Sequence, residues 1–304
     1  MSREVEVLRD ADIIARLTAR DAVDWIRQAI GAAHRGELVT PPRTHVPFDG
    51  GRLTYTAGRM PGRWFGYRSY DSFDMPSGDQ IVAIHAEPSG DVAGIAVTAE
   101  LGPMRVGAIG GVAADALASP GASSLGLIGT GTQAWMQLWA ISTVRRLDSV
   151  AVYGRDPERR ERFAANASER YGLDVRASDG PEAAVSDRDI VVLATNSGTP
   201  VVDAAAIRPD AYVTTLGPKL RGRAEFDAAL AERAALVVTD SPAQVRAYDP
   251  PFVLTGTPHL DRMVSLGAVL AGEVRPEPGT LFCSVGLAGT EAYLLARLVG
   301  LEFR

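Results

Sequence analysis

Two patterns of hydrophobic and polar residues divide the chain. Between residues 52 and 99, runs rich in aromatic and β-branched residues follow one another with only turns between them. This pattern predicts strands in an antiparallel sheet, at residues 53–57, 64–70, 80–86 and 92–99. Before them we expect a short strand at 5–8, a helix from Asp10 to Leu17, and a second helix whose buried stripe is Ala22, Ile26, Ala29, Ile30 and Ala33.

From residue 124 onward, short apolar runs alternate with helical patterns, which is typical of a parallel sheet. We expect its strands at 125–128, 150–153, 175–177, 190–194, 212–216, 236–239 and 280–284. Helices are expected at 105–118, 132–146, 260–271 and 285–299, and Ser119-Pro120-Gly121 marks a boundary. The predicted fold is therefore α/β. A doubly wound, Rossmann-type sheet spans residues 119–286, and an α+β domain combines 1–118 with about 287–304.

The segment SLGLIGTGTQA, residues 124–134, joins an apolar run to a helix through glycines. Gly129, Gly131 and Ala134 have the spacing of the dinucleotide-binding fingerprint G-x-G-x-x-G/A. In that fingerprint the first glycine allows a tight turn, the second lets the backbone approach a pyrophosphate, and the last small residue packs helix against strand. The N-terminus of the helix then faces the phosphates. The candidate cofactor-binding residues are thus Gly129, Thr130, Gly131, Thr132, Gln133 and Ala134; a methyltransferase-type glycine loop is the main alternative.

The end of the second parallel strand bears on the choice of cofactor. An NAD site usually has an acidic residue there to bind the ribose 2′-hydroxyl, whereas this chain has Gly154 and Arg155. Arg155 can meet a 2′-phosphate, with Arg159 or Arg160 assisting, and Asp156 is expected to cap the next helix ahead of Pro157. NADP(H) is therefore favoured over NAD(H). Further cofactor-binding candidates follow later strands: Ala194, Thr195, Asn196, Ser284 and Gly286.

Composition and charge exclude several classes of function. The 304 residues are 46% hydrophobic and 22% charged, with a formal net charge of −6 and no run of like charges, so we expect no nucleic-acid partner. No apolar run is long enough to span a membrane, and the single cysteine, Cys283, fits a cytoplasmic protein. The four histidines lack metal-ligand spacing, so no metal is expected, and no G-x-S-x-G motif supports acyl transfer.

Several stretches together resemble the ornithine cyclodeaminase/mu-crystallin family. They are PPRTH at 41–45, Arg105 before a small-residue helix, LGLIGTGTQA at 125–134, ATNSGTPVV at 194–202 and LFCSVGLA at 281–288. The resemblance implies a nucleotide-binding domain beside a substrate-binding and dimerisation domain built from both chain ends. It also implies a homodimer and nicotinamide-dependent chemistry at a carbon that bears an amine or imine, on a small carboxylate.

Carried over residue by residue, the resemblance places Arg43 and Arg105 where the family binds the substrate carboxylate. Two catalytic positions depart from the family pattern: the usual lysine falls on Arg68 and the usual aspartate on Lys219. Arg68 is a candidate both for the catalytic site and for substrate binding, where it can anchor charge because guanidinium keeps its proton. A buried lysine can exchange protons, so Lys219 is the candidate general acid. His45 is a minor candidate, since it points to the same side of an extended segment as Arg43.

Three functions stay open. The first is NADPH-dependent reduction of the C=N bond of a small imine or ketimine carboxylate, or the reverse oxidation of an amino acid. The second is a cyclodeaminase in which NAD is reduced and reoxidised within one turnover. The third is a non-enzymatic, NADPH-dependent binding protein for a small carboxylate. The missing aspartate argues against the second, so we predict an NAD(P)-dependent imine reductase or amino-acid dehydrogenase.

Overall fold

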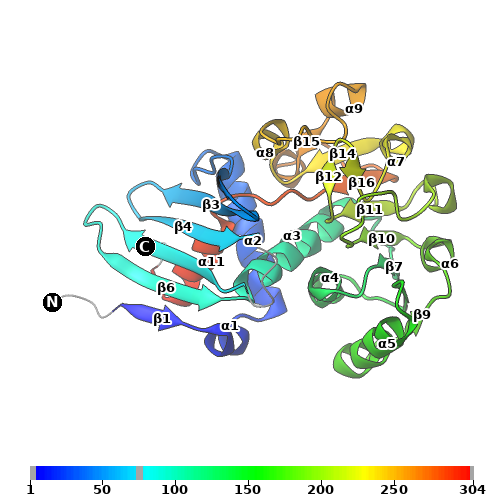
Figure 1. The fold of residues 1–304 in the computed structure, drawn as a ribbon, viewed down its shortest axis with the longest axis horizontal. Coiled ribbons are helices and arrows are strands. Elements are labelled where there is room, and N and C mark those ends of the chain that lie inside the picture. Colours follow the sequence, from blue (N-terminus) through cyan, green and yellow to red (C-terminus); the bar gives the residue numbers. More distant parts are fainter. Residues whose placement is uncertain (1–4, 73–77, 302–304) are drawn as a thin grey trace. The chain divides into compact units, whose positions relative to one another are not determined.

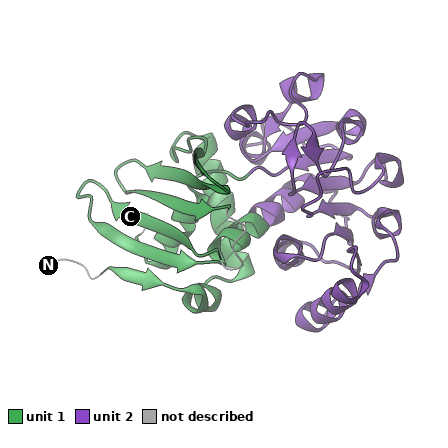
Figure 2. Cartoon of the chain, in the orientation of Figure 1, with its two compact units in different colours: residues 1–108, 286–304 green, residues 109–285 purple. Residues whose placement is uncertain are grey.

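The computed structural model describes residues 5–72 and 78–301, which form two compact units (Figures 1 and 2). Unit 1 takes residues 1–108 and 286–304, and unit 2 takes residues 109–285. The first boundary falls inside helix α3 (Leu101–Leu117), before the predicted limit at residue 118. The assignment of the units to substrate binding and dimerisation stays a prediction.

Unit 1 contains a six-stranded sheet in the order β1-β6-β5-β4-β3-β2. The strands are β1 (Glu6–Leu8), β2 (Thr44–Phe48), β3 (Gly51–Met60), β4 (Trp64–Asp71), β5 (Gln80–Ala86) and β6 (Val92–Thr98). Strands β2 to β6 pair antiparallel, as predicted for residues 52–99, whereas β1 lies parallel to β6 and makes the sheet mixed.

Helices cover one face of this sheet. Helix α11 (Thr290–Leu298) contacts strands β3 to β6, and α2 (Ala19–His34) contacts α11; the unit also contains α1 (Asp10–Arg16). Along β4, Trp64, Gly66 and Arg68 point to the covered side and are buried, while Phe65 and Tyr67 point to the other side and are exposed. The last helix begins at residue 290 rather than 285, because Gly286 and Gly289 adopt positive φ angles of 85° and 78°.

Unit 2 contains an eight-stranded sheet in the order β15-β14-β16-β11-β10-β7-β8-β9, with every pairing parallel. The strands are β7 (Ser124–Ile128), β8 (Ser149–Tyr153), β9 (Val175–Ala177), β10 (Ile190–Leu193), β11 (Tyr212–Thr215), β14 (Leu236–Thr239), β15 (Val264–Ser265) and β16 (Thr280–Cys283). A small hairpin joins β12 (Lys219–Leu220) to β13 (Arg223–Ala224). The predicted doubly wound α/β fold is confirmed.

Short helices connect these strands. They are α4 (Thr132–Val144), α5 (Pro157–Tyr171), α6 (Pro181–Val185), the 3₁₀ helix η1 (Ala204–Ala206), α7 (Ala228–Arg233), α8 (Pro242–Arg246), α9 (Pro258–Asp261) and α10 (Leu266–Leu270). The single helix predicted over 260–271 is wrong. Val264 pairs with Val238 of β14 as an edge strand, and Ser265 then caps α10 by accepting a hydrogen bond from the Ala268 amide at 3.1 Å.

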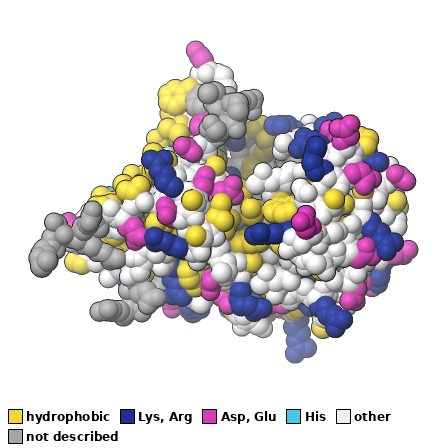
Figure 3. Space-filling model, turned by 90° about the horizontal axis from the view of Figure 1, so that it is seen from below, with side chains coloured by type: hydrophobic (Ala, Val, Ile, Leu, Met, Phe, Trp, Pro, Cys, Tyr) yellow, Lys and Arg dark blue, Asp and Glu magenta, His cyan; other side chains and the backbone are white. Residues whose placement is uncertain are grey.

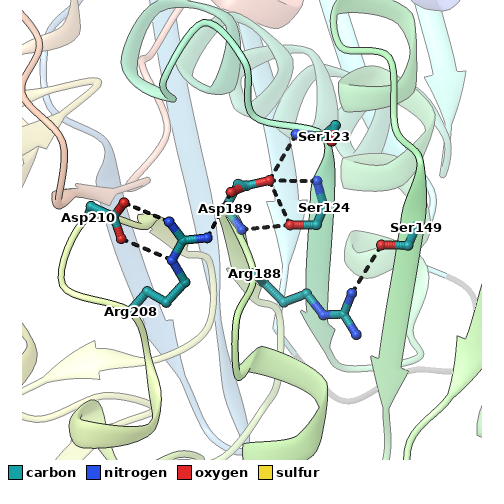
Figure 4. A network of polar contacts seen from close by, with 7 residues as sticks. All are labelled: Ser123, Ser124, Ser149, Arg188, Asp189, Arg208 and Asp210. Carbon is teal, nitrogen blue, oxygen red and sulfur yellow. Dashed lines mark hydrogen bonds and ion pairs between the residues drawn. The ribbon is translucent and has the colours of Figure 1, made fainter.

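A polar network ties the amino ends of β7 and β10 together (Figure 4). The Asp189 carboxylate accepts hydrogen bonds from the backbone amides of Ser123 and Ser124, both at 3.0 Å, and from the Ser124 hydroxyl at 2.7 Å. Arg208 forms an ion pair with the same carboxylate at 3.1 Å and another with Asp210. These residues satisfy one another's hydrogen-bonding groups. The network therefore holds the amino ends of the two neighbouring strands together.

The surface carries mixed charge. On the face shown in Figure 3, basic and acidic side chains are interspersed. Among residues 5–72 and 78–301, no helix is both long enough and apolar enough to cross a membrane.

Candidate functional site

A cavity of about 710 Å³ opens at the carboxyl ends of β7, β8 and β10 in unit 2. Strand β7 pairs with β8 on one side and with β10 on the other, so the chain order reverses here. Doubly wound sheets bind ligands at this point. The wall is formed by the glycine turn, the end of β8 and the segment after β10, and it includes Gly129, Thr130, Gly131, Thr132, Gln133, Gly154, Arg155, Arg159, Ala194, Thr195 and Asn196.

The glycine turn has the geometry that a dinucleotide requires. Gly129 has a φ angle of 127°, and a Cβ at this position would collide with the carbonyl oxygen of Ala194. Gly131 is the N-cap of α4 and has open space where a Cβ would stand. Ala134 is completely buried, as close helix–strand packing demands. The free amides at the start of this 13-residue helix favour an anion.

The end of β8 supplies cationic side chains to the same wall. A Cβ on Gly154 would come within 2.8 Å of the Thr130 side chain, so the close approach of the two turns needs a glycine. Arg155 is exposed and Arg159 lies beside it in the wall. The predicted cap is confirmed, because the Asp156 carboxylate accepts a hydrogen bond from the Arg159 amide at 3.1 Å.

Three predicted cofactor-binding residues of unit 2 are absent from this wall: Ala134, which is packed in the core, Arg160 and Ser284. Arg160 reaches the Gly154 carbonyl and the Asp179 carboxylate, each at 3.4 Å. Ser284 lies at the end of β16, where its hydroxyl donates to Asp240 at 3.4 Å. The cavity therefore contains Arg159 rather than Arg160.

The loop after β11 carries Lys219, whose side chain is 2% exposed. Its Nζ donates to the Gly217 carbonyl at 2.7 Å. The chain returns through the β12–β13 hairpin to Glu225, which is completely buried. Lys219 is thus buried and follows the carboxyl end of β11, and the cavity also lies at the carboxyl ends of the strands.

Unit 1 contains a buried cationic cluster on the covered face of its sheet. Arg68 on β4 and Arg105 on α3 share one carboxylate oxygen of Glu291 on α11: Arg105 Nε donates to it at 2.9 Å, and both side chains form ion pairs with it. Burial would raise the pKa of Glu291, but the charges of Arg105 and Arg68 outweigh burial and hold it at about 2. Two guanidiniums and one carboxylate leave one buried positive charge.

Two nitrogens of this cluster, Arg68 Nη2 and Arg105 Nη1, make no hydrogen bond to any residue within 5–72 or 78–301. Each lies beside a glycine. A Cβ on Gly102 would come within 2.9 Å of Arg68 Nη2, and a Cβ on Gly286 within 2.8 Å of Arg105 Nη1. The two glycines therefore let these guanidinium nitrogens pack closely against the backbone, and Gly286 belongs to this cluster.

The orientation of Arg68 is fixed by its neighbours. Its Nε donates to Gln80 Oε1 at 2.8 Å, and its guanidinium lies 4.0 Å from the centre of the Tyr70 ring.

Two further predicted site residues lie at the start of β2. Arg43 directly precedes this strand and is half-buried, and His45 Nδ1 lies 3.0 Å from the Thr54 hydroxyl. Burial, together with the charges of Arg52 and Arg43, lowers the pKa of His45, so this histidine is neutral at physiological pH.

Residues 3–300 match the sequence profile of the ornithine cyclodeaminase/mu-crystallin family. The chain belongs to this family. The predicted resemblance is thereby confirmed over nearly its whole length.

Several members of the family are similar to this chain. A Δ1-pyrroline-2-carboxylate reductase of Bacillus cereus is 31% identical over 61% of this chain and 59% of its own. An L-lysine cyclodeaminase of Streptomyces rapamycinicus is 28% identical over 81% of this chain and 77% of its own. The fold is that of a Δ1-pyrroline-2-carboxylate reductase from Thermococcus litoralis, solved with NADH and L-proline. That structure has a TM-score of 0.88 and 24% identity, and it covers 97% of this chain and 96% of the other.

The sequence analysis did not identify two buried carboxylates: Glu291, which pairs with Arg68 and Arg105, and Glu225, which lies near the loop that carries Lys219. Glu291 follows a glycine-containing loop, and its role depends on arginines far away in the sequence. Glu225 lies outside the stretches that carry the family resemblance, and its role depends on the contact between two loops. Among the described residues no group of three or more metal-ligating side chains could hold a metal ion.

Proposed function

We propose that this chain is an NAD(P)-dependent oxidoreductase that reduces the C=N bond of a small imino carboxylate, or catalyses the reverse oxidation of an amino acid. The observation that carries the proposal is the Arg68–Arg105–Glu291 cluster. It holds excess positive charge and two guanidinium nitrogens that have no hydrogen-bond partner among residues 5–72 and 78–301, in a chain that also has a dinucleotide cavity. Relatives named as imino-acid reductases support this interpretation.

The substrate carboxylate is proposed to bind the cationic cluster. An uncompensated buried charge is costly, so an anion that completes the cluster is stabilised there. Arg68 Nη2 and Arg105 Nη1 supply charge-assisted hydrogen bonds, which are roughly twice as strong as neutral ones. Arg43 is proposed to assist.

The cavity residues fit a nicotinamide dinucleotide: a glycine turn with positive φ, a helix N-terminus with open space before it, Arg155 after β8 and Arg159 on α5. When bound, the cofactor supplies hydride. Gly129 to Gln133 are proposed to hold the pyrophosphate, and Ala194 to Asn196 to line the opposite side. Arg155, with Arg159 beside it, is proposed to bind a 2′-phosphate, so that NADP(H) is preferred to NAD(H).

Lys219 is proposed to hold the proton that the imine nitrogen needs. An imine accepts hydride best when its nitrogen is protonated, which requires a group able to donate a proton. Arg68 cannot serve, because guanidinium stays protonated at every physiological pH. Lys219 is buried, and its ammonium is oriented by the Gly217 carbonyl.

We propose that two copies of the chain form a homodimer through unit 1. The contact would be made by the sheet face opposite α11. Strand pairing places seven apolar side chains on that one face, each between 38% and 55% exposed: Val7, Val46, Phe48, Tyr55, Phe65, Tyr67 and Ile81. Contiguous apolar surface of this kind marks an interaction site, and a second copy would bring an identical face. Light scattering of dilute protein should give the mass of a dimer, and the variant Tyr67→Lys should give a monomer; a monomeric wild type would contradict the proposal.

A cofactor-coupled screen tests the reaction. Purified protein is supplied with NADPH or NADH and a panel of cyclic imines and keto acid–amine pairs, and in the reverse direction with amino acids. Equal amounts of cofactor oxidised and amino acid formed support the proposal. Ammonia release from ornithine or lysine without net cofactor change would instead establish a cyclodeaminase. Tight ligand binding without turnover would establish a binding protein.

A further inference from the structure

Glu225 stands out because its buried carboxylate is satisfied by two different loops. Oε2 accepts hydrogen bonds from the backbone amide and the hydroxyl of Thr195, each at 2.9 Å. Oε1 accepts from the amide of Leu216 at 2.9 Å and from the amide of Gly217. Thr195 lies in the wall of the dinucleotide cavity after β10, and residues 216–217 begin the loop that carries Lys219.

The two loops touch closely at this carboxylate. A Cβ on Gly217 would collide with the carbonyl oxygen of Thr195 and come within 2.5 Å of Glu225 Oε2. Gly217 also accepts the hydrogen bond from Lys219 Nζ. The same residue therefore contacts the cavity wall, the carboxylate and the candidate acid.

Charge links these groups as well. Burial is the main cause that raises the pKa of the Cys283 thiol to about 12, the charge of Lys219 lowers it, and the charges of Asp240 and Glu225 raise it. Lys219, Glu225 and Asp240 are thus electrostatic neighbours of one buried thiol. Glu225 thus contacts both loops directly, and its charge and that of Lys219 act on the same thiol.

We propose that Glu225 is a positioning residue that couples the cofactor cavity to Lys219. By holding the Thr195 amide and the Leu216 and Gly217 amides on one carboxylate, it gives the cavity wall and the Lys219 loop a single relative position. The coupling to proton transfer rests on the proposed function. The coupling between the two loops does not.

The four hydrogen bonds make a distinctive demand on this side chain. All four partners donate, so both oxygens must accept, and only a carboxylate does this. In Glu225→Gln the amide NH₂ would face two donors, either those of Thr195 or those of the Lys219 loop. Glu225→Gln, although nearly isosteric, should therefore break the hydrogen bonds to one of the two loops.

The test measures amide exchange and cofactor affinity, neither of which needs turnover. In Glu225→Gln, the amides of Thr195, Leu216 and Gly217 should exchange with deuterium at least tenfold faster, and the dissociation constant of NADPH should rise about tenfold. Lys219→Met should leave both quantities as in the wild type. Gly121→Ala, which adds a methyl group into open space, is the matched control for Gly217→Ala, which should reproduce the effects of Glu225→Gln.

A double-mutant cycle measured in kcat distinguishes a role in positioning Lys219 from a purely structural role. Because Glu225 is proposed to act on proton transfer through Lys219, kcat of Glu225→Gln/Lys219→Met should equal that of Lys219→Met within about threefold. A double variant whose kcat falls by the product of the two single losses would overturn the coupling to proton transfer.

Unchanged exchange at Thr195 in both Glu225→Gln and Gly217→Ala would overturn the coupling of the loops. If Glu225→Gln does not fold, Thr195→Val removes one donor and should give a smaller rise in the same dissociation constant; an unchanged constant would count against the proposal.

Discussion

Glu291 and Glu225 are both buried carboxylates, one in each unit, and they accept hydrogen bonds from opposite kinds of donor. Glu291 is bound by two guanidiniums. Glu225 is bound by three backbone amides and one hydroxyl, with no guanidinium contact among the described residues. The same side chain therefore builds two different kinds of centre.

The two carboxylates differ in the net charge and the unused hydrogen-bond donors that remain around them. Two arginines around one carboxylate leave a positive charge and donors for a ligand, so the Glu291 centre is suited to binding an anion. Amides carry no net charge, so Glu225 fixes the position of two loops and offers no donor to a substrate. We therefore propose that the Glu291 centre recognises the substrate and that Glu225 positions two loops.

The largest expected effect tests the charge pairing at Glu291. Its pKa of about 2 in the folded protein lies below the ordinary value of 4.5. The pairing therefore stabilises the protein above pH 4.5, and this contribution, about 3 kcal/mol, is lost as the pH falls toward 2. Urea unfolding between pH 6 and 3 should show a steeper loss for the wild type than for Glu291→Gln. Parallel pH dependences would mean that Glu291 is not held by these charges.

Lys219 tests the chemistry at the positioned loop. Lys219→Met should lower kcat by roughly 100-fold or more, which is the usual contribution of general acid–base catalysis. The dissociation constant of NADPH should change little. Lys219→Arg keeps the charge but cannot release the proton, so it should be equally slow. Near-normal turnover of either variant would remove Lys219 from the mechanism.

Arg105 tests the recognition centre. Arg105→Lys keeps the charge but loses the planar fork that serves Glu291 and the free position together. Losing a charge-assisted hydrogen bond costs about 2 kcal/mol, so KM for the imino carboxylate should rise roughly 30-fold while cofactor affinity is retained. Arg146→Lys, at a side chain that is 95% exposed, is the control. Equal KM values for the wild type and Arg105→Lys would place the carboxylate elsewhere.

Arg155 should give the smallest effect of this series. Arg155→Ala should raise KM for NADPH about tenfold or more by removing a charge-assisted bond to the 2′-phosphate, and barely change that for NADH. The measurement compares the two cofactors in steady-state kinetics at fixed ionic strength. Equal changes for both cofactors would refute the preference for NADP(H).

The parts of the fold that depend on local sequence could be predicted. The glycine turn at Gly129, the cap at Asp156 and the alternation of strands and helices follow from residues close together in the chain. The segment 260–271 failed because its apolar pattern suits a helix and an edge strand equally, and only pairing with β14 decides between them.

The site could be predicted only in part. Arg68 and Arg105 were identified as substrate-binding candidates, but Glu291 lies 223 residues from Arg68, and its role arises only when α11 packs on the sheet. The choice of Arg159 over Arg160 depends on which side of α5 faces the cavity. Such features follow from tertiary packing, and no motif reports them.

The most direct test of the account follows the hydride itself. The protein is incubated with NADPH carrying deuterium at the transferred position of C4, together with a cyclic imino carboxylate such as Δ1-pyrroline-2-carboxylate, and the product is analysed by mass spectrometry. The account predicts one deuterium at the α-carbon of the product amino acid for each NADPH oxidised. An amino acid product that carries no deuterium from the cofactor would contradict it.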